Sequence, residues 1–312
     1  MNLPLVTGAT GFAGSHLLER LLETTDAVAA WANAHGRPAP AGDPRVTWSA
    51  VDLLDPAAVE RALGELQPSV IYHLAGRPHV AEAWKTSGRS LRVNALGTHH
   101  VLTAAARVAP DCKVIVAGSA LVYKPAVSAL REDDPLGPSD PYGLSKLAQE
   151  MIAERSATAV VRTRPFNHAG PRQSESFVTS SFAKQIAEIE AGARDPKLLV
   201  GNLDARRDIM DVRDTARAYA ALAAAGRPGQ VYNICSGTAY RVGDLLERLL
   251  GLARVRVHVE QDPARLRPSD NPLVLGDAAR LTRDTGWQPM IPIERTLADL
   301  LAWWRIRVAA AR

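Results

Sequence analysis

The stretch Leu3 to Leu22, LPLVTGATGFAGSHLLERLL, decides the fold class of this chain. It joins a short apolar segment to an amphipathic stretch of helical length through three glycines, Gly8, Gly11 and Gly14. Glycines between a strand and a helix allow a tight turn, close approach of a pyrophosphate to the backbone, and close helix packing. The amino end of the helix then faces the phosphates. This stretch predicts a dinucleotide-binding unit at the start of the chain.

Short apolar runs continue to alternate with amphipathic stretches up to about residue 165. The sequence runs through VTWSAV, PAAVERALGEL, SVIYHLAG, RVNALGTHHVLTAAARV, KVIVAGS and YGLSKLAQEMIAERS. This alternation predicts an α/β fold, a Rossmann-type doubly wound parallel sheet with helices on both faces. From about Phe166 the pattern becomes irregular, with Gly/Pro-rich loops, which indicates a smaller α/β lobe in the C-terminal half. We expect residues 1–165 and about 206–236 in the dinucleotide domain, and 166–205 and 237–312 in the second lobe.

Composition narrows the class of protein. The chain has 312 residues, 46% apolar and 22% charged, which suits a globular protein with a large core. Its two cysteines, Cys112 and Cys235, form no metal-ligand pattern, so we expect buried thiols, no metal site and a cytoplasmic location. We found no signal peptide and no long apolar window, so we expect no membrane association. The net charge of +4 comes without a basic run, so we expect no nucleic-acid partner.

Several segment ends are expected to contact the dinucleotide. Asp52 lies where a carboxylate could accept a hydrogen bond from the adenine amino group, although a role in a turn or a helix cap is the alternative. The segment HLAG ends a strand and brings small residues against the cofactor. The predicted contacts are Gly8, Thr10, Gly11, Phe12, Ala13, Gly14, Asn33, Asp52, Leu53, Leu74, Ala75 and Gly76.

The end of the second predicted strand indicates the type of cofactor. Enzymes that use NAD place an acidic residue there, on the ribose hydroxyls. This chain has Asn33 at that point and no acid before Asp43, with His35 and Arg37 just downstream. The absence of a carboxylate favours NADP(H), and NAD(H) is possible. The alternative is that these side chains are solvated loop residues.

Tyr142 and Lys146, in DPYGLSKLAQE, are candidates for proton transfer. Their i, i+4 spacing puts both side chains on one face of a helix. An ammonium beside a phenol favours the phenolate, so we expect Lys146 to lower the pKa of Tyr142. Ser119 follows the apolar segment KVIVAG, and its hydroxyl lies at the end of a predicted strand. Without Tyr142, a satisfied core hydroxyl would be the simpler interpretation of Ser119.

These motifs together resemble the extended short-chain dehydrogenase/reductase family, whose pattern is TGxxGxxG, a strand-end Ser or Thr, and YxxxK. The resemblance covers nearly the whole chain. It implies that Ser119, Tyr142 and Lys146 form the catalytic set and that Tyr142 and Lys146 also contact the cofactor.

The second lobe resembles the branch that contains GDP-mannose 4,6-dehydratases and GDP-4-keto-6-deoxymannose reductases. The similar segments include RPFNHAGPRQSESFVTSSFAKQIAEIEAG, VGNLDARRDIMDVRDTARAY and DPARLRPSDNP. The resemblance implies that His168 lies against the cofactor and that a GDP-sugar is the substrate. The implied substrate contacts are Asn167, Val178, Lys184, Arg207, Arg267 and Asp270. Arginine matches phosphate oxygens well. The alternative for Arg207 is a solvated side chain or a salt bridge to Asp208 or Asp211.

Leu121 bears on the reaction. In the dehydratases of this branch the residue two positions after the catalytic Ser or Thr is a Glu that acts as acid and base in the elimination of water. Leucine cannot transfer a proton, and Glu132, Asp133 and Asp134 are typical of a solvated acidic turn. The sequence therefore favours a reductase of a 4-keto-6-deoxyhexose on GDP. A 4-epimerase, a 4,6-dehydratase and a non-catalytic NADP(H)-sensing protein are the alternatives.

The resemblance also implies a homodimer. Family members pair two helices across a two-fold axis into a four-helix bundle. The corresponding stretches here, Ala95 to Val108 and Pro141 to Ser156, carry Ala, Leu and Met on more than one face.

Overall fold

A computed structural model describes residues 3–34, 42–78, 80–266 and 271–311. Seven parallel strands form the larger sheet, in the order β10-β6-β5-β4-β1-β2-β3. The strands are β1 (Pro4–Thr7), β2 (Val28–Ala32), β3 (Val46–Ala50), β4 (Val70–His73), β5 (Lys113–Ala117), β6 (Ala159–Pro165) and β10 (Val231–Ile234). This order is that of a doubly wound dinucleotide-binding sheet, as predicted.

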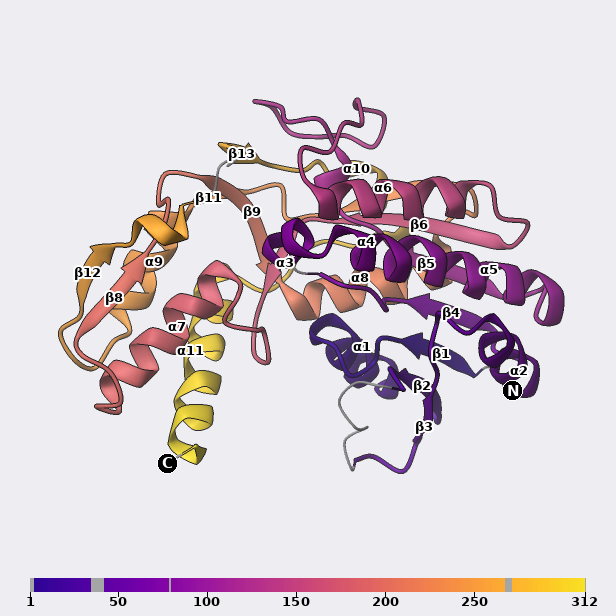
Figure 1. The fold of residues 1–312 in the computed structure, drawn as a ribbon, viewed down its shortest axis with the longest axis horizontal. Coiled ribbons are helices and arrows are strands. Elements are labelled where there is room, and N and C mark those ends of the chain that lie inside the picture. The colour runs from indigo at the N-terminus through magenta and orange to yellow at the C-terminus, as the bar shows by residue number, and fades with distance from the viewer. Residues whose placement is uncertain (1–2, 35–41, 79, 267–270, 312) are drawn as a thin grey trace.

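Helices cover both faces of the larger sheet (Figure 1). Alternate strand residues explain this, because Leu5 and Ile71 enter one core and their neighbours Val6 and Tyr72 enter the other. One face packs on α1 (Phe12–Leu22), α8 (Val212–Ala225) and α10 (Ala279–Thr285). The opposite core includes side chains of α2 (Pro56–Leu66), α5 (Gly97–Val108) and α6 (Pro141–Glu154). The short helices α3 (Val80–Lys85) and α4 (Ser87–Leu91) contact α6.

The predicted helix over RVNALGTHHVLTAAARV is interrupted at its start. Residues Arg92–Leu96 form a π-helical turn, η1, before α5 begins at Gly97. Asn94 within this turn is fully buried and its side chain contacts the backbone of Arg77 and the hydroxyl of Ser145. Single π-helical turns within helices often occur at functional sites.

The second lobe contains two small sheets and three long helices. In one sheet β9 (Arg206–Asp211) pairs with β7 (Asn167–Ala169), β11 (Ala239–Arg241) and β13 (Leu273–Val274). In the other, β8 (Lys197–Val200) pairs with β12 (His258–Gln261). The core of this lobe is formed with α7 (Val178–Glu190), α9 (Val242–Gly251) and α11 (Ile293–Ala310). Two short 3-10 turns, η2 (Ala120–Val122) and η3 (Pro263–Arg265), complete the described elements.

We predicted that residues 206–236 belong to the dinucleotide domain, but in the structure they are divided between the two lobes. The helix α8 packs against α1, and β10 is the edge strand beside β6. The strand β9, however, is the centre of the small sheet. The chain therefore crosses from the second lobe to the larger one where β9 ends and α8 begins.

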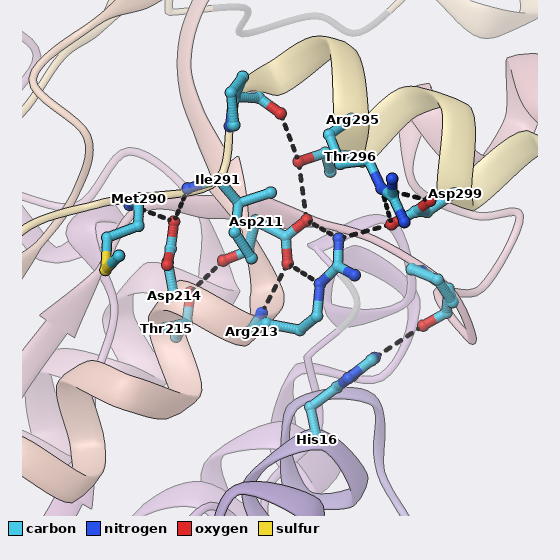
Figure 2. Close-up of polar contacts among 12 residues, drawn as sticks. His16, Asp211, Arg213, Asp214, Thr215, Met290, Ile291, Arg295, Thr296 and Asp299 are labelled. Atoms are coloured by element: carbon cyan, nitrogen blue, oxygen red, sulfur yellow. Dashed lines mark hydrogen bonds and ion pairs between the residues drawn. The ribbon is translucent and has the colours of Figure 1, made fainter.

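A buried carboxylate anchors that crossing point. Asp211 caps α8 by accepting a hydrogen bond from the Arg213 backbone N–H, and its carboxylate also accepts one from the Thr296 hydroxyl at 2.7 Å (Figure 2). The Arg213 guanidinium then bridges Asp211 and Asp299 on α11. Asp214, in the first turn of α8, accepts hydrogen bonds from the backbone N–H groups of Met290 and Ile291. These contacts fix α11 of the second lobe to α8 of the larger one.

Candidate active site

A single cavity of about 1870 Å³ lies between the carboxyl ends of the central strands and the second lobe. It brings together all the residues that we predicted for catalysis and for the cofactor. Ligands of doubly wound sheets bind outside the carboxyl ends of the strands, at the point where the strand order reverses. Here that point lies between β1 and β4, and the cavity is lined there by Gly8, Ala75 and Gly76.

The glycine-rich turn is shaped for a close backbone approach. Gly8 has a φ of +67°, and a Cβ on it would lie 2.7 Å from the Cα of Ala75. A Cβ on Gly14 would lie 2.3 Å from the Gly8 carbonyl oxygen. Gly11 is the N-cap of α1, which has no side-chain cap and no acidic residue in its first turn. An uncapped helix start of this kind offers backbone N–H groups and a positive dipole end to phosphates.

Asn33 and Asp52 both line the cavity. Asn33 directly follows β2, and the acidic residue in the described part of that loop, Asp43, lies ten positions further on and pairs with Arg45. Asp52 also fills the structural role that we considered as its alternative, because it accepts a hydrogen bond from the Leu54 backbone N–H at 2.9 Å. The cap of α2 is provided instead by Asp55. His35 and Arg37 lie outside the described residues.

The three predicted catalytic side chains come together at one wall of the cavity. Ser119 follows β5 and caps η2 by accepting a hydrogen bond from the Leu121 backbone N–H at 3.1 Å. Asp140 caps α6, which places Tyr142 in the first turn and Lys146 one turn later. All three are buried, with 7% exposure for Ser119, 9% for Tyr142 and 6% for Lys146. The Ser119 hydroxyl lies near enough to that of Tyr142 to favour the phenolate, against the larger effect of burial.

The protonation of this group differs from our expectation. Burial raises the pKa of Tyr142 to about 12, and the Ser119 hydroxyl offsets this only in part. Burial also lowers the pKa of Lys146 to about 7. The predicted lowering of the Tyr142 pKa by Lys146 is therefore wrong, because the effect of burial dominates. At neutral pH Tyr142 keeps its proton and can act as an acid.

Three of the predicted substrate contacts line the cavity on the side of the second lobe: Asn167, Val178 and Arg207. The Arg207 guanidinium donates a hydrogen bond to the Arg206 carbonyl oxygen at 3.0 Å. Asp208 and Asp211, the salt-bridge partners that we considered for it, accept hydrogen bonds from other groups. Asp208 is held by Ser236, Gly237 and Gly276, and Asp211 by Arg213 and Thr296.

Lys184 is not among the residues that line the cavity. Its ammonium lies 3.0 Å from Glu175 and 3.7 Å from Glu188, and 5.5 Å from the ring centroid of Trp304. The two remaining predicted contacts, Arg267 and Asp270, lie outside the described residues.

His168 connects the second lobe to the glycine-rich turn. Its ring stacks on that of Phe12, with centroids 5.6 Å apart and planes 13° from parallel. Its Nδ1 donates a hydrogen bond to the Phe166 carbonyl oxygen at 3.0 Å, and burial lowers its pKa. A neutral imidazole thus lies beside Phe12, one of the residues that we expect at the cofactor.

The model that describes the GDP-mannose 4,6-dehydratase family matches residues 5–300. The chain belongs to this family. It is 37% identical to GDP-6-deoxy-D-mannose reductase of Pseudomonas aeruginosa over 97% of both chains. The solved structure of RMD from Pseudomonas aeruginosa complexed with NADPH superposes with a TM-score of 0.86 at 34% identity, covering 98% of this chain and 100% of that one. A putative epimerase from Burkholderia cenocepacia J2315 superposes with a TM-score of 0.85 at 32% identity, covering 98% of each chain.

For a member of the GDP-mannose 4,6-dehydratase family, the acidic residues around Leu121 are of particular interest. Our expectation that Glu132 is solvated is wrong, because its side chain is buried, with 8% exposure. Its carboxylate accepts a hydrogen bond from the Asn233 backbone N–H at 2.9 Å and lies 3.6 Å from the Arg280 guanidinium. Asp133 is exposed and pairs with Arg280. Neither Glu132 nor Asp133 lines the cavity.

Sequence reasoning missed a group of buried polar side chains behind Lys146. Gln149, Thr98, His73 and Thr7 form a continuous chain of hydrogen bonds. Each is at most 1% exposed. The sequence indicates only that Gln149 lies three residues beyond Lys146 on the same helix. The other three members, Thr98, His73 and Thr7, lie on α5, β4 and β1.

Proposed function

We propose that this chain reduces the 4-keto group of a 4-keto-6-deoxyhexose carried on GDP, with NADPH, to give GDP-6-deoxy-D-mannose. The observation that carries the proposal is the group formed by Ser119, Tyr142 and Lys146 in a cavity whose adjoining residue 121 is leucine. The likeness to the reductase of Pseudomonas aeruginosa supports the same reaction.

Each residue of the group has a part in the reaction. NADPH, when bound, supplies the hydride to C4 of the sugar. Ser119 donates a hydrogen bond to the ketone oxygen and polarises it. Tyr142, whose raised pKa keeps the phenol protonated, donates its proton to the alkoxide that forms at that oxygen. Lys146, charged below about pH 7, holds the nicotinamide ribose and stabilises the phenolate left on Tyr142.

No carboxylate among the described residues of the cavity is suited to act as the base for the elimination of water. The carboxylates among its described lining residues are Asp52, Asp140 and Glu175. Asp140 caps α6 through the Gly143 backbone N–H, and Glu175 pairs with Lys184. Asp52 lies with Asn33 and Leu53 in the part of the cavity that we assign to the adenosine. A leucine at 121 offers only apolar surface, which favours a reductase over a dehydratase.

The cofactor and substrate assignments rest on charge. An uncharged Asn33 at the end of β2 permits the 2′-phosphate of NADPH, which a carboxylate would repel. Arg207 and Asn167 on the opposite side of the cavity would hold the GDP moiety, Arg207 by charge-assisted hydrogen bonds to its diphosphate.

No described helix is long and apolar enough to cross a membrane. The two cysteines are buried free thiols, which supports a cytoplasmic location.

The assembly that we propose is a homodimer. Large apolar side chains are exposed along α3, α4, η1 and α6, which lie together on one side of the larger sheet (Figure 1). These are Trp84 at 60% exposure, Leu91 at 44%, Leu96 at 40%, Leu144 at 58% and Met151 at 48%. An apolar strip of this kind, on α6 and on the helical turns packed against it, is suited to a bundle with the same face of a second copy.

The test uses the purified, unmodified protein. Incubated with GDP-4-keto-6-deoxymannose and NADPH, it should oxidise NADPH and yield one 4-hydroxy product, identified by NMR. Tyr142→Phe, which removes only the transferable proton, should lower turnover at least about a hundredfold. Given GDP-mannose and NADP, the protein should form no 4-keto product. Robust dehydration would show that another residue supplies the base and would refute the proposal.

A 4-epimerase is the second candidate, since a putative epimerase is among the similar structures. An epimerase returns the hydride to the sugar in each turnover and consumes no cofactor. Interconversion of two nucleotide sugars without net oxidation of NADPH would favour it.

A further inference from the structure

The Lys146 ammonium is oriented by two acceptors that differ in kind. It donates one hydrogen bond to the Ala117 carbonyl oxygen at 2.8 Å and another to the Gln149 side-chain oxygen Oε1, also at 2.8 Å. The first acceptor belongs to the backbone at the end of β5, but the second is a side chain that could rotate. Gln149 is fully buried on α6, so whatever holds its amide also determines the orientation of Lys146.

The amide of Gln149 is held by Thr98. Gln149 Nε2 donates to the Thr98 hydroxyl at 2.8 Å, and that hydroxyl donates its single proton to the Asn94 carbonyl oxygen at 2.7 Å. A carbonyl oxygen can only accept, so the Thr98 oxygen has only lone pairs left for its other neighbours. A flipped amide would set Oε1 against those lone pairs and Nε2 against the ammonium. Only one amide orientation therefore satisfies both neighbours of Gln149.

His73 completes the arrangement on the far side of Thr98. Its Nε2 lies 2.8 Å from the Thr98 hydroxyl oxygen, which must accept, so Nε2 carries the ring proton. Its Nδ1 then accepts a hydrogen bond from the Thr7 hydroxyl at 2.9 Å, and Thr7 accepts one from the Ala75 backbone N–H at 3.2 Å. Burial and the charge of Lys146 lower the pKa of His73 to about 3, so the ring stays neutral.

No charged group of the described residues stabilises the Lys146 ammonium, so its two hydrogen-bond acceptors provide the main stabilisation. The titratable groups that face it are His73 from β4 and Tyr142 from α6, and both are neutral at pH 7. Glu150, the next residue after Gln149, pairs instead with Arg164 on β6 at 2.6 Å. No described carboxylate forms an ion pair with Lys146, whose ammonium is stabilised by the two oxygen acceptors.

We propose that Gln149 is a positioning residue for catalysis, which keeps Lys146 protonated and directed at the cleft, and that Thr98 and His73 fix its amide for this purpose. The inference rests on the proposed function for its kinetic consequence. Hydrogen bonding to the charged form of a group favours that form, so loss of Oε1 should lower the pKa of Lys146. A carboxylate at the same position should raise it.

The direct test is titration of Lys146 in the protein without cofactor. The chain contains only six lysines, at positions 85, 113, 124, 146, 184 and 197, so the side-chain NMR signals of isotopically labelled lysine should be resolved. Lys146→Met identifies the signal of residue 146. We expect the pKa of Lys146 to fall by about one in Gln149→Met, to rise in Gln149→Glu, and to fall in Thr98→Val but not in Thr98→Ser. An unchanged Lys146 titration in Gln149→Met would overturn the inference.

Kinetics provide the second measurement. If the pKa of Lys146 falls by about one, kcat/KM for NADPH in Gln149→Met should be about tenfold lower than in the wild type at pH 8 and about twofold lower at pH 6. A purely structural role for Gln149 would lower activity equally at both pH values, and that result would contradict the inference. Gln185→Met is the matched control, because Gln185 is also buried and hydrogen-bonded, but its partners are Ser181 and the backbone of Leu199 instead of Lys146.

The two proposals can fail separately. If the wild-type protein does not reduce the keto sugar, the proposed function is wrong, while the Lys146 titration still decides the role of Gln149. If Gln149→Glu does not fold, Gln149→Met and the two Thr98 variants decide it.

Discussion

Asn33 places an uncharged amide at the end of β2, where it lines the cavity. Asn33→Asp changes the shape of this side chain very little and adds one negative charge. At a separation of about 4 Å such a charge would repel a 2′-phosphate by about 1 kcal/mol or more, depending on exposure. We expect the ratio of kcat/KM for NADPH to that for NADH to fall at least about fivefold, measured by steady-state kinetics at one pH. An unchanged ratio would show that the side chain of residue 33 does not distinguish NADPH from NADH at the ribose 2′ position.

The pH dependence of activity should reflect Lys146. Its folded-state pKa of about 7 lies below the ordinary value of lysine, so the side chain is charged below pH 7 and neutral above it. The kcat/KM for NADPH, which reports the free enzyme, should therefore fall as the pH rises through 7. The phosphates of a bound cofactor favour the ammonium, so the fall in kcat should come at higher pH. A kcat/KM for NADPH that stays constant up to pH 9 would contradict this assignment.

The residues that could be predicted from the sequence are those defined by local spacing. The three glycines, Tyr142 and Lys146 lie within short motifs whose geometry is set by one turn or one helix. The pKa of Tyr142 could not be predicted in the same way, because it depends on burial by distant segments. The same holds for Gln149, because its partner Thr98 lies on α5 and His73, which bonds Thr98, lies on β4.

Among the elements, the π-helical turn η1 is the clearest departure from the periodic pattern. The stretch Arg92 to Val108 has helical periodicity throughout, and the single glycine at the change, Gly97, is tolerated within a helix. The turn is coupled to tertiary contacts, because Asn94 within it hydrogen-bonds the Arg77 backbone N–H and the Ser145 hydroxyl. The Asn94 backbone carbonyl also accepts a hydrogen bond from the Thr98 hydroxyl. A local irregularity thus serves the hydrogen-bond chain behind Lys146, which periodicity alone does not reveal.

The junction of β9, α8 and α11 depends on the buried Asp211 (Figure 2). Thr296→Val keeps the shape of that side chain and removes the hydroxyl that donates to the carboxylate at 2.7 Å. A hydrogen bond to a buried charge contributes about 1.5–3 kcal/mol, so we expect the variant to unfold at clearly lower urea concentration. Thr103→Val, the same change at an exposed position on α5, should alter stability by less than about 0.5 kcal/mol. Equal stability of the two variants would show that Asp211 does not need Thr296.

For the whole molecule, the sheet and its two-sided helical cover followed from the alternation of segments, and the structure confirms them. The existence of the second lobe could be predicted from the sequence, but the pairing of its strands could not. Its central strand β9 pairs with β7, β11 and β13, which are separated from it by many residues and contain only two or three each. Strands this short carry too little periodicity to be recognised, and their register is set by contacts that the sequence does not display.

The exposed apolar strip on α6 allows the proposed dimer to be tested. Leu144 and Met151 are seven residues apart on this helix, so they lie on one face, with 58% and 48% exposure. Light scattering should give twice the chain mass of 33.5 kDa for the wild type at micromolar concentration. The double variant Leu144→Glu, Met151→Glu places two like charges from each copy in the bundle and should yield the mass of a single chain. Met290→Glu, at a position that is 73% exposed outside the strip, should remain a dimer. A wild-type protein that is already monomeric would refute the proposed assembly, and a double variant that stays dimeric would place the interface on another face.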